Sequence, residues 1–180
     1  METYFMFSND IEKTIGFTGH RPSSLPWKYD ESKSSCKAFK KDLYEILEKA
    51  ILSGWTNFIS GMAIGFDTIA AETVLELKKK YKQVKLFGAI PCPGQEDKWS
   101  DDDKARYHKL MKKLDGFEIC SESYAGADTM YKRNRFIVDH SNVIVALWNG
   151  SPRSGTANTI NYAKSQGRKV RVINPNDYTK

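Results

Sequence analysis

Short apolar runs alternate with stretches of helical periodicity along this chain, and this alternation limits its fold more than any other feature. The expected strands lie at residues 14–17, 55–59, 84–90, 117–120, 142–148 and 168–173. Between them, apolar residues recur three or four positions apart, as on one face of a helix. The expected helices lie at residues 39–50, 66–81, 101–114, 127–140 and 155–166. Strands and helices that alternate in this way form a mostly parallel sheet with helices on both faces, so the sequence predicts the α/β fold class.

The length and composition fit a single domain. The chain has 180 residues, of which 40% are hydrophobic, and this is enough for one core. We expect residues 1–180 to form one domain with its core at about 13–174, and residues 1–12 to be a loose lead-in. The sequence shows no internal repeat and no linker.

The net charge and the number of cysteines indicate which partners and which cellular compartment to expect. The 28 basic and 22 acidic residues give a net charge of +6, which suits a phosphate-bearing partner but is modest for a nucleic-acid specialist. Three scattered cysteines indicate a reducing compartment. No apolar run approaches the roughly twenty residues of a membrane span. We therefore expect a cytoplasmic protein with no membrane partner.

The stretch from 58 to 67, Phe-Ile-Ser-Gly-Met-Ala-Ile-Gly-Phe-Asp, has the pattern of a strand, a tight turn and a helix start. Glycines at such a junction let backbone N–H groups approach a ligand closely, and a helix start carries partial positive charge that favours phosphate. We therefore predict an anion-binding turn that includes Ser60, Gly61, Met62 and Gly65. The alternative is that the two glycines only permit the turn.

Two further turns at expected strand ends combine glycine with hydroxyl and arginine side chains. Their candidate ligand-binding residues are Thr18, Gly19, His20 and Arg21 after the first strand, and Ser154, Gly155 and Thr156 after the fifth. In parallel sheets, ligands collect at the carboxyl ends of the strands, where the strand order reverses. Backbone N–H groups, hydroxyls and guanidinium groups that converge there suit a phosphate or a ribose phosphate. The alternative for His20 and Arg21 is a pair of loop residues that contact the protein itself.

These turns resemble those of a known superfamily. Residues 60–67 look like the Ser-Gly-Met-Ala-x-Gly-Ile-Asp turn of DNA-processing protein A, and residues 18–21 look like the Gly-Ser-Arg or Gly-Thr-Arg turn after that family's first strand. Residues 130–134 and 146–156 are similar to the Met-x-x-Arg-Lys helix and the Gly-Thr loop of the LONELY GUY phosphoribohydrolases. From about residue 14 to 172 the chain thus resembles the SLOG superfamily, most of all its YpsA-like branch. The resemblance implies a single Rossmann-like domain.

Two departures from the LONELY GUY motifs bear on catalysis. The glutamate that follows their Gly-Thr pair is replaced here by Thr159, and the lysine of their Arg-Lys pair is replaced by Asn134. Cleavage of a glycosidic bond needs a carboxylate. Asp67 and Glu72 are the candidate substitutes, although Asp67 also fits a stabiliser of a helix start. The sequence leaves open whether the chain is an enzyme, and the resemblance still implies ligand binding through Arg133.

The aromatic residues and the metal-binding residue types give weaker signals. Trp99 follows the proline-rich end of the third strand, and we expect it near the site, stacked on a base. The alternative is a hydrophobic plug under the loop. Cys92 and the three histidines lack the spacing of metal ligands, so no metal and no catalytic residue is assigned.

We therefore expect the chain to bind a nucleotide or a nucleotide-derived, ADP-ribose-like ligand, as a sensor or regulatory protein, and we assign no other cofactor. In this hypothesis the phosphates contact Gly19, Ser60, Gly61, Gly155 and Thr156, the positive charge comes from Arg21 and Arg133, and a ribose hydroxyl contacts Asp67 or Asn134. Two alternatives stay open: a nucleotide N-glycosidase that uses His20 or Asp67, and a single-stranded DNA-binding module that resembles DNA-processing protein A. Relatives in the superfamily often dimerise, which favours a homodimer.

Overall fold

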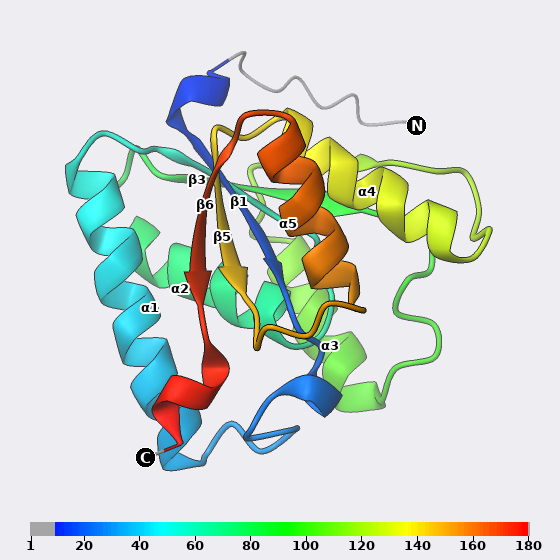
Figure 1. Cartoon of the computed structure of the whole chain (residues 1–180), viewed down its shortest axis with the longest axis horizontal. Coiled ribbons are helices and arrows are strands. Elements are labelled where there is room, and N and C mark those ends of the chain that lie inside the picture. The colour runs from blue at the N-terminus through cyan, green and yellow to red at the C-terminus, as the bar shows by residue number, and fades with distance from the viewer. Residues whose placement is uncertain (1–9, 180) are drawn as a thin grey trace.

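The computed structural model describes residues 10–179 and contains a six-stranded sheet with helices on both sides (Figure 1). In chain order the elements are η1 (Ile11–Lys13), β1 (Thr14–Gly19), η2 (Pro22–Ser24), α1 (Ser34–Leu52), β2 (Asn57–Ser60), α2 (Phe66–Lys80), β3 (Lys85–Ile90), α3 (Asp101–Met111), β4 (Gly116–Ile119), α4 (Ala127–Asp139), β5 (Val143–Leu147), α5 (Gly155–Ser165), β6 (Lys169–Ile173) and η3 (Pro175–Tyr178). The predicted α/β class and Rossmann-like architecture are confirmed.

The strands lie in the order β4-β3-β2-β1-β5-β6, and each neighbouring pair is parallel. The chain first builds the sheet outward from β1 to β4 and then returns to place β5 on the other side of β1. This reversal makes the carboxyl ends of β1 and β5 the switch point of the sheet, where ligands of such folds bind.

Two apolar layers hold the helices on the sheet. Helices α1, α2 and α3 cover one face, where the core includes Phe17 of β1, Phe39 of α1 and Phe66 of α2. Helices α4 and α5 cover the other face, over a smaller cluster that includes Ile137 and Ala163. The helical spacing of apolar residues in the sequence therefore corresponds to the buried side of each helix.

The first strand differs from the expectation at its carboxyl end. The sequence predicts that it stops at Phe17, but β1 continues through Thr18 and Gly19, which lie opposite Ala146 and Leu147 of β5. The parallel pairing with β5 extends the strand by two residues, and an apolar run alone does not reveal such a pairing. Most of the expected lead-in, residues 1–9, lies outside the described residues.

Within residues 10–179, no helix has both the length and the hydropathy needed to cross a membrane.

Candidate functional site

A cavity of about 330 Å³ opens at the switch point, beside the carboxyl end of β1 and the start of α5. It is lined by Phe17, Thr18, Gly19, His20, Arg21, Ser23, Ser24, Asp67, Met130, Arg133, Asn134, Ser154, Gly155 and Thr156. The lining comes from β1 and the loop after it, from α2, from α4 and from the α5 start. Segments far apart in the chain therefore meet around one space.

Most of the predicted site residues lie around this cavity. The structure brings together Thr18, Gly19, His20, Arg21, Asp67, Arg133, Asn134, Ser154, Gly155 and Thr156. The predicted residues outside the lining are Ser60, Gly61, Met62, Gly65 and Trp99. Direct ligand contact by this second group stays a prediction, and the structure shows other tasks for several of them.

The turn after β2 uses its polar groups internally. The Ser60 hydroxyl donates to the backbone carbonyl of Asp67 at 2.9 Å and accepts from the N–H of Met62 at 3.1 Å. At the α2 start, the N–H of Phe66 donates to the carbonyl of His20 at 3.2 Å. These three donors are therefore already used within the protein.

The position of the Arg133 side chain requires a glycine at residue 61. The Arg133 Nη1 donates to the Gly61 carbonyl at 2.7 Å, and a Cβ at position 61 would lie only 2.5 Å from that nitrogen. The Arg133 Nε donates to the Asn134 side-chain carbonyl at 2.9 Å. Arg133 is 4% exposed and lines the cavity, so a buried guanidinium is held at the wall by the turn after β2 and by its neighbour on α4.

Asp67 places a buried carboxyl beside this guanidinium. The N–H of Ala63 donates to its Oδ2 at 3.4 Å. Burial raises the pKa of the Asp67 carboxyl, and the positive charges of Arg133 and Arg21 act in the opposite direction. Burial likewise lowers the pKa of Arg133, and Asp67 opposes that change. The cavity thus holds one carboxyl and two guanidinium groups that influence one another.

His20 connects the loops after β1 and β5. Its Nε2 accepts from the backbone N–H of Asn149 at 3.1 Å, so the neutral ring carries its proton on Nδ1. Burial lowers the pKa of His20. The residue is 5% exposed and lines the cavity. A neutral His20 therefore offers an N–H donor at this wall.

The start of α5 is open to an acceptor. Ser154 caps the helix, because its hydroxyl accepts from the N–H of Ala157 at 3.1 Å. Among residues 10–179, the backbone N–H groups of Gly155 and Thr156 have no hydrogen-bond partner. Apart from the adjacent residues and the helix backbone, no heavy atom lies within 4 Å of a Cβ built on Gly155, so the space beside this residue is open. Unsatisfied N–H groups at a helix start suit an anion.

Sequence reasoning missed four lining residues: Phe17, Ser23, Ser24 and Met130. Ser23 and Ser24 follow the Thr-Gly-His-Arg-Pro turn directly, and η2 folds them back beside Arg21. Their adjacency to that turn is the signal that could have found them. Met130 lies one helical turn before Asn134 on α4 and therefore shares its side of the helix.

The predicted residue Trp99, the candidate substitute carboxylate Glu72 and the motif position Thr159 all lie outside the cavity lining. Trp99 packs edge-on against Tyr107 with ring centroids 5.4 Å apart, as the hydrophobic-plug alternative expects. Glu72 pairs with Arg106, and the buried Thr159 hydroxyl donates to the Gly155 carbonyl at 2.9 Å. Among the described lining residues, Asp67 is thus the one carboxylate. The residues that the structure describes also contain no group of three or more His, Cys, Asp or Glu side chains that could hold a metal.

Two solved structures share the fold. DNA processing protein A from Streptococcus pneumoniae aligns with a TM-score of 0.58 at 19% identity, over 88% of this chain and 49% of that protein. DNA processing protein A from Helicobacter pylori, whose structure was described for its single-stranded DNA binding mode, aligns with a TM-score of 0.62 at 18% identity, over 91% of this chain and 66% of that one. The chain therefore spans about half of the first protein and about two thirds of the second.

Sequence comparisons identify the family of the chain. An uncharacterised SPbeta prophage-derived protein, YoqJ of Bacillus subtilis strain 168, is 35% identical over 137 residues, which cover 69% of this chain and 80% of YoqJ. A UPF0398 protein of Brevibacillus brevis is 33% identical over 122 residues, which cover 65% of this chain and 63% of that protein. The YpsA model, described as the YspA SLOG family, matches residues 15–178. The resemblance noted in the sequence is thus confirmed, and the chain belongs to the YspA SLOG family.

Proposed function

We propose that this chain binds a nucleotide or a nucleotide-derived ligand, such as ADP-ribose, in the cavity at the switch point. The observation that carries the proposal is the convergence of five residues around one space: Gly155 and Thr156, whose N–H groups have no partner among residues 10–179, together with Arg21, Arg133 and His20. The volume of this cavity, about 330 Å³, falls in the range of roughly 300–1,000 Å³ that is typical of small-molecule sites.

In this proposal a phosphate lies at the start of α5. It accepts from the N–H groups of Gly155 and Thr156, and the guanidinium of Arg21 neutralises it from the opposite loop. A phosphate and a carboxylate repel each other because both are negatively charged. In this proposal Asp67 therefore contacts the ribose, whose hydroxyl groups donate to the carboxylate. The positive charge of Arg133 near the Asp67 carboxyl reduces the repulsion between this carboxyl and the phosphate.

Isothermal titration calorimetry with inorganic phosphate, AMP, ADP and ADP-ribose tests this proposal. Arg21→Ala removes a half-buried cavity arginine, and we expect it to weaken nucleotide binding about tenfold to a hundredfold, as for loss of a hydrogen bond to a charged group. Arg153→Ala is the matched control, because Arg153 is an exposed loop arginine beside Ser154 that does not line the cavity. Absence of nucleotide binding at millimolar concentration, or equal losses in both variants, contradicts the proposal.

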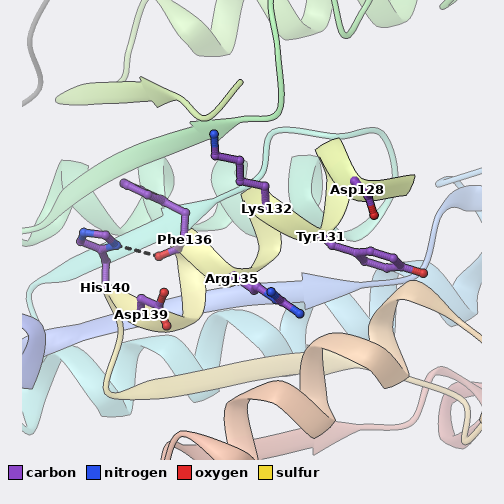
Figure 2. Close-up of a pocket in the computed structure, with 7 residues that line it drawn as sticks. All are labelled: Asp128, Tyr131, Lys132, Arg135, Phe136, Asp139 and His140. Carbon is purple, nitrogen blue, oxygen red and sulfur yellow. Dashed lines mark hydrogen bonds between the residues drawn. The ribbon is translucent and has the colours of Figure 1, made fainter. Parts of the chain in front are cut away.

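A second candidate is binding of single-stranded nucleic acid, the property for which the structure of DNA processing protein A from Helicobacter pylori was described. The supporting observation on this chain is the outer side of α4, where Tyr131, Lys132 and Arg135 line a groove of about 420 Å³ (Figure 2). Tyr124, in the loop before α4, is 70% exposed. Aromatic and basic side chains together suit stacked bases and a phosphate backbone, although Asp128 in the same groove opposes the backbone charge.

Fluorescence anisotropy with a labelled oligo-dT strand separates the two candidates. Nucleic-acid binding requires an affinity that falls steeply as salt is raised. It also requires that Lys132→Ala weakens binding more than Lys109→Ala, since Lys109 is an exposed lysine of α3 on the opposite face of the sheet. Equal affinities for the two variants, or binding that salt does not change, would remove this candidate.

A further inference from the structure

We propose that Glu31 is a positioning residue for the cavity, because its ion pair with Arg106 holds the segment 21–33 in place as the outer wall. The proposal rests on the proposed ligand site and adds a residue that lies outside the cavity lining. It concerns how the wall is held, so it can fail or succeed separately from the identity of the ligand.

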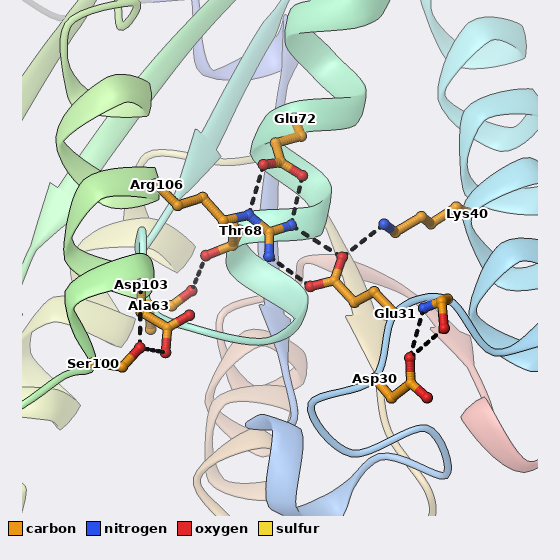
Figure 3. A network of polar contacts seen from close by, with 10 residues as sticks. Asp30, Glu31, Lys40, Ala63, Thr68, Glu72, Ser100, Asp103 and Arg106 are labelled. Atoms are coloured by element: carbon orange, nitrogen blue, oxygen red, sulfur yellow. Dashed lines mark hydrogen bonds and ion pairs between the residues drawn. The ribbon is translucent and has the colours of Figure 1, made fainter.

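Arg106 of α3 binds two carboxylates at once (Figure 3). Its Nη1 and Nη2 donate to Glu31 at 2.6 and 3.0 Å. Its Nε and Nη2 donate to Glu72 of α2, both at 2.7 Å. Lys40 of α1 adds a contact to Glu31 at 2.6 Å. The segment 21–33 is thereby tied to α3 and α1 through Glu31, whereas the Glu72 contact ties α3 to α2 only.

The segment 21–33 has two sides. On one side Arg21, Ser23 and Ser24 line the ligand cavity. On the other side Trp27 and Glu31 line a separate cavity of about 320 Å³ beside Arg106. The segment thus contributes to the lining of both cavities, and we expect a change in its anchoring at Glu31 to reach Arg21, Ser23 and Ser24.

Local contacts hold the segment 21–33 at three places along its length. In η2 the N–H of Ser24 donates to the Arg21 carbonyl at 3.0 Å, so Ser24 and Arg21 move together. Trp27 is 1% exposed and stacks on Phe39 of α1 with ring centroids 5.3 Å apart, which fixes the middle of the segment. Glu31 fixes its far end, since the side chains of Glu31 and Arg106 are 26% and 31% exposed and therefore partly shielded from solvent.

Glu31→Gln and Glu72→Gln form a matched pair of tests. Each replaces one carboxylate of Arg106 by an amide of the same shape, but only Glu31 belongs to the wall. We expect Glu31→Gln to weaken ADP-ribose binding about fivefold to tenfold, because the binding-competent wall is less populated, and Glu72→Gln to leave it within about twofold. Hydrogen exchange should speed up across residues 22–33 in Glu31→Gln and stay unchanged there in Glu72→Gln.

The outcomes separate the two proposals. Equal loss of ADP-ribose affinity in both variants, or none in either, overturns the positioning role of Glu31. If the wild-type chain binds no ADP-ribose, the proposed ligand fails, and hydrogen exchange alone decides whether Glu31 holds the wall. Unchanged exchange of residues 22–33 in Glu31→Gln then overturns the inference.

Discussion

The Nη1 of Arg133 donates to the backbone carbonyl of Gly61 at 2.7 Å, although the two residues lie 72 positions apart in the chain. This bond joins α4 to the turn after β2 and fixes a buried guanidinium at the cavity wall. The Ser-Gly-Met-Ala turn and the arginine of α4, which the sequence presents as separate motifs, are thus two parts of one arrangement. The glycine gives the arginine room to reach the carbonyl.

Gly61→Ala should therefore destabilise the chain and weaken ligand binding. The new methyl group would lie 2.5 Å from Arg133 Nη1 and 2.7 Å from Asp67 Oδ2, so the guanidinium has to leave its place. We expect the free energy of unfolding to fall by about 1–3 kcal/mol, as for other overpacked sites, when measured by urea denaturation.

Gly155→Ala is the control for the effect of Gly61→Ala on stability. No heavy atom lies within 4 Å of a Cβ at position 155, so we expect the free energy of unfolding to change by less than about 0.5 kcal/mol. Equal urea midpoints for Gly61→Ala and the wild-type chain would show that the position of Arg133 does not require a glycine at residue 61.

Gly19→Ala should be destabilising for a different reason. A Cβ at position 19 would lie 2.3 Å from the Phe66 ring, which is itself held edge-on by Phe17 at a centroid distance of 5.8 Å. We expect a loss of about 1–3 kcal/mol in unfolding free energy. In a double-mutant cycle, Phe66→Ala removes the Cγ and Cδ1 atoms that lie 2.6 and 2.3 Å from the new methyl group, and we expect a coupling of at least about 0.5 kcal/mol. Strict additivity of the two substitutions would contradict the contact.

The stability of the chain should fall as the solution is acidified through the titration range of histidine. Burial lowers the pKa of His20 from 6.5, so below pH 6.5 the unfolded chain binds a proton that the folded chain still excludes. The favourable contribution of neutral His20 is complete above pH 6.5 and decreases as the pH falls toward the lowered pKa. Protonation of Nε2 would also break the bond from the Asn149 N–H.

His20→Gln should reduce this pH dependence, because a glutamine side chain does not titrate and its carbonyl can accept from Asn149. The measurement is the urea midpoint at several values between pH 7.5 and about pH 5.5, which lies above the usual pKa range of exposed carboxylates. Asp67, whose pKa burial raises, is present in both proteins, so its contribution cancels in the comparison. His108 and His140 are present in both proteins and serve as an internal reference. A slope that His20→Gln leaves intact would assign the effect to other groups.

The sequence predicts the framework well because each strand has an apolar run and each helix an apolar side, as in the continuous run of β5 and the repeat of Phe66, Ala70 and Val74 in α2. The details that it misses depend on contacts between distant segments. The extension of β1 through Gly19 needs the pairing with Leu147.

The cavity lining, too, is predicted only in part by the sequence. The glycine and hydroxyl turns mark the correct edge of the sheet, but composition does not tell which turn is free to bind. At Ser60 the hydroxyl is used within the turn, whereas the N–H groups of Gly155 and Thr156 remain free of partners in residues 10–179. The two turns have similar compositions, but the polar groups of the first bond within the turn and to the start of the next helix.

Amide NMR spectra of the labelled chain, recorded during a titration with ADP-ribose, show whether a phosphate-bearing nucleotide lies at the start of α5. We predict saturable shifts of the Gly155 and Thr156 amide signals, together with those of Arg21, and much smaller shifts at Lys132 on the outer side of α4. Shifts confined to α4, or no saturable shift at Gly155 and Thr156, would contradict nucleotide binding at this helix start.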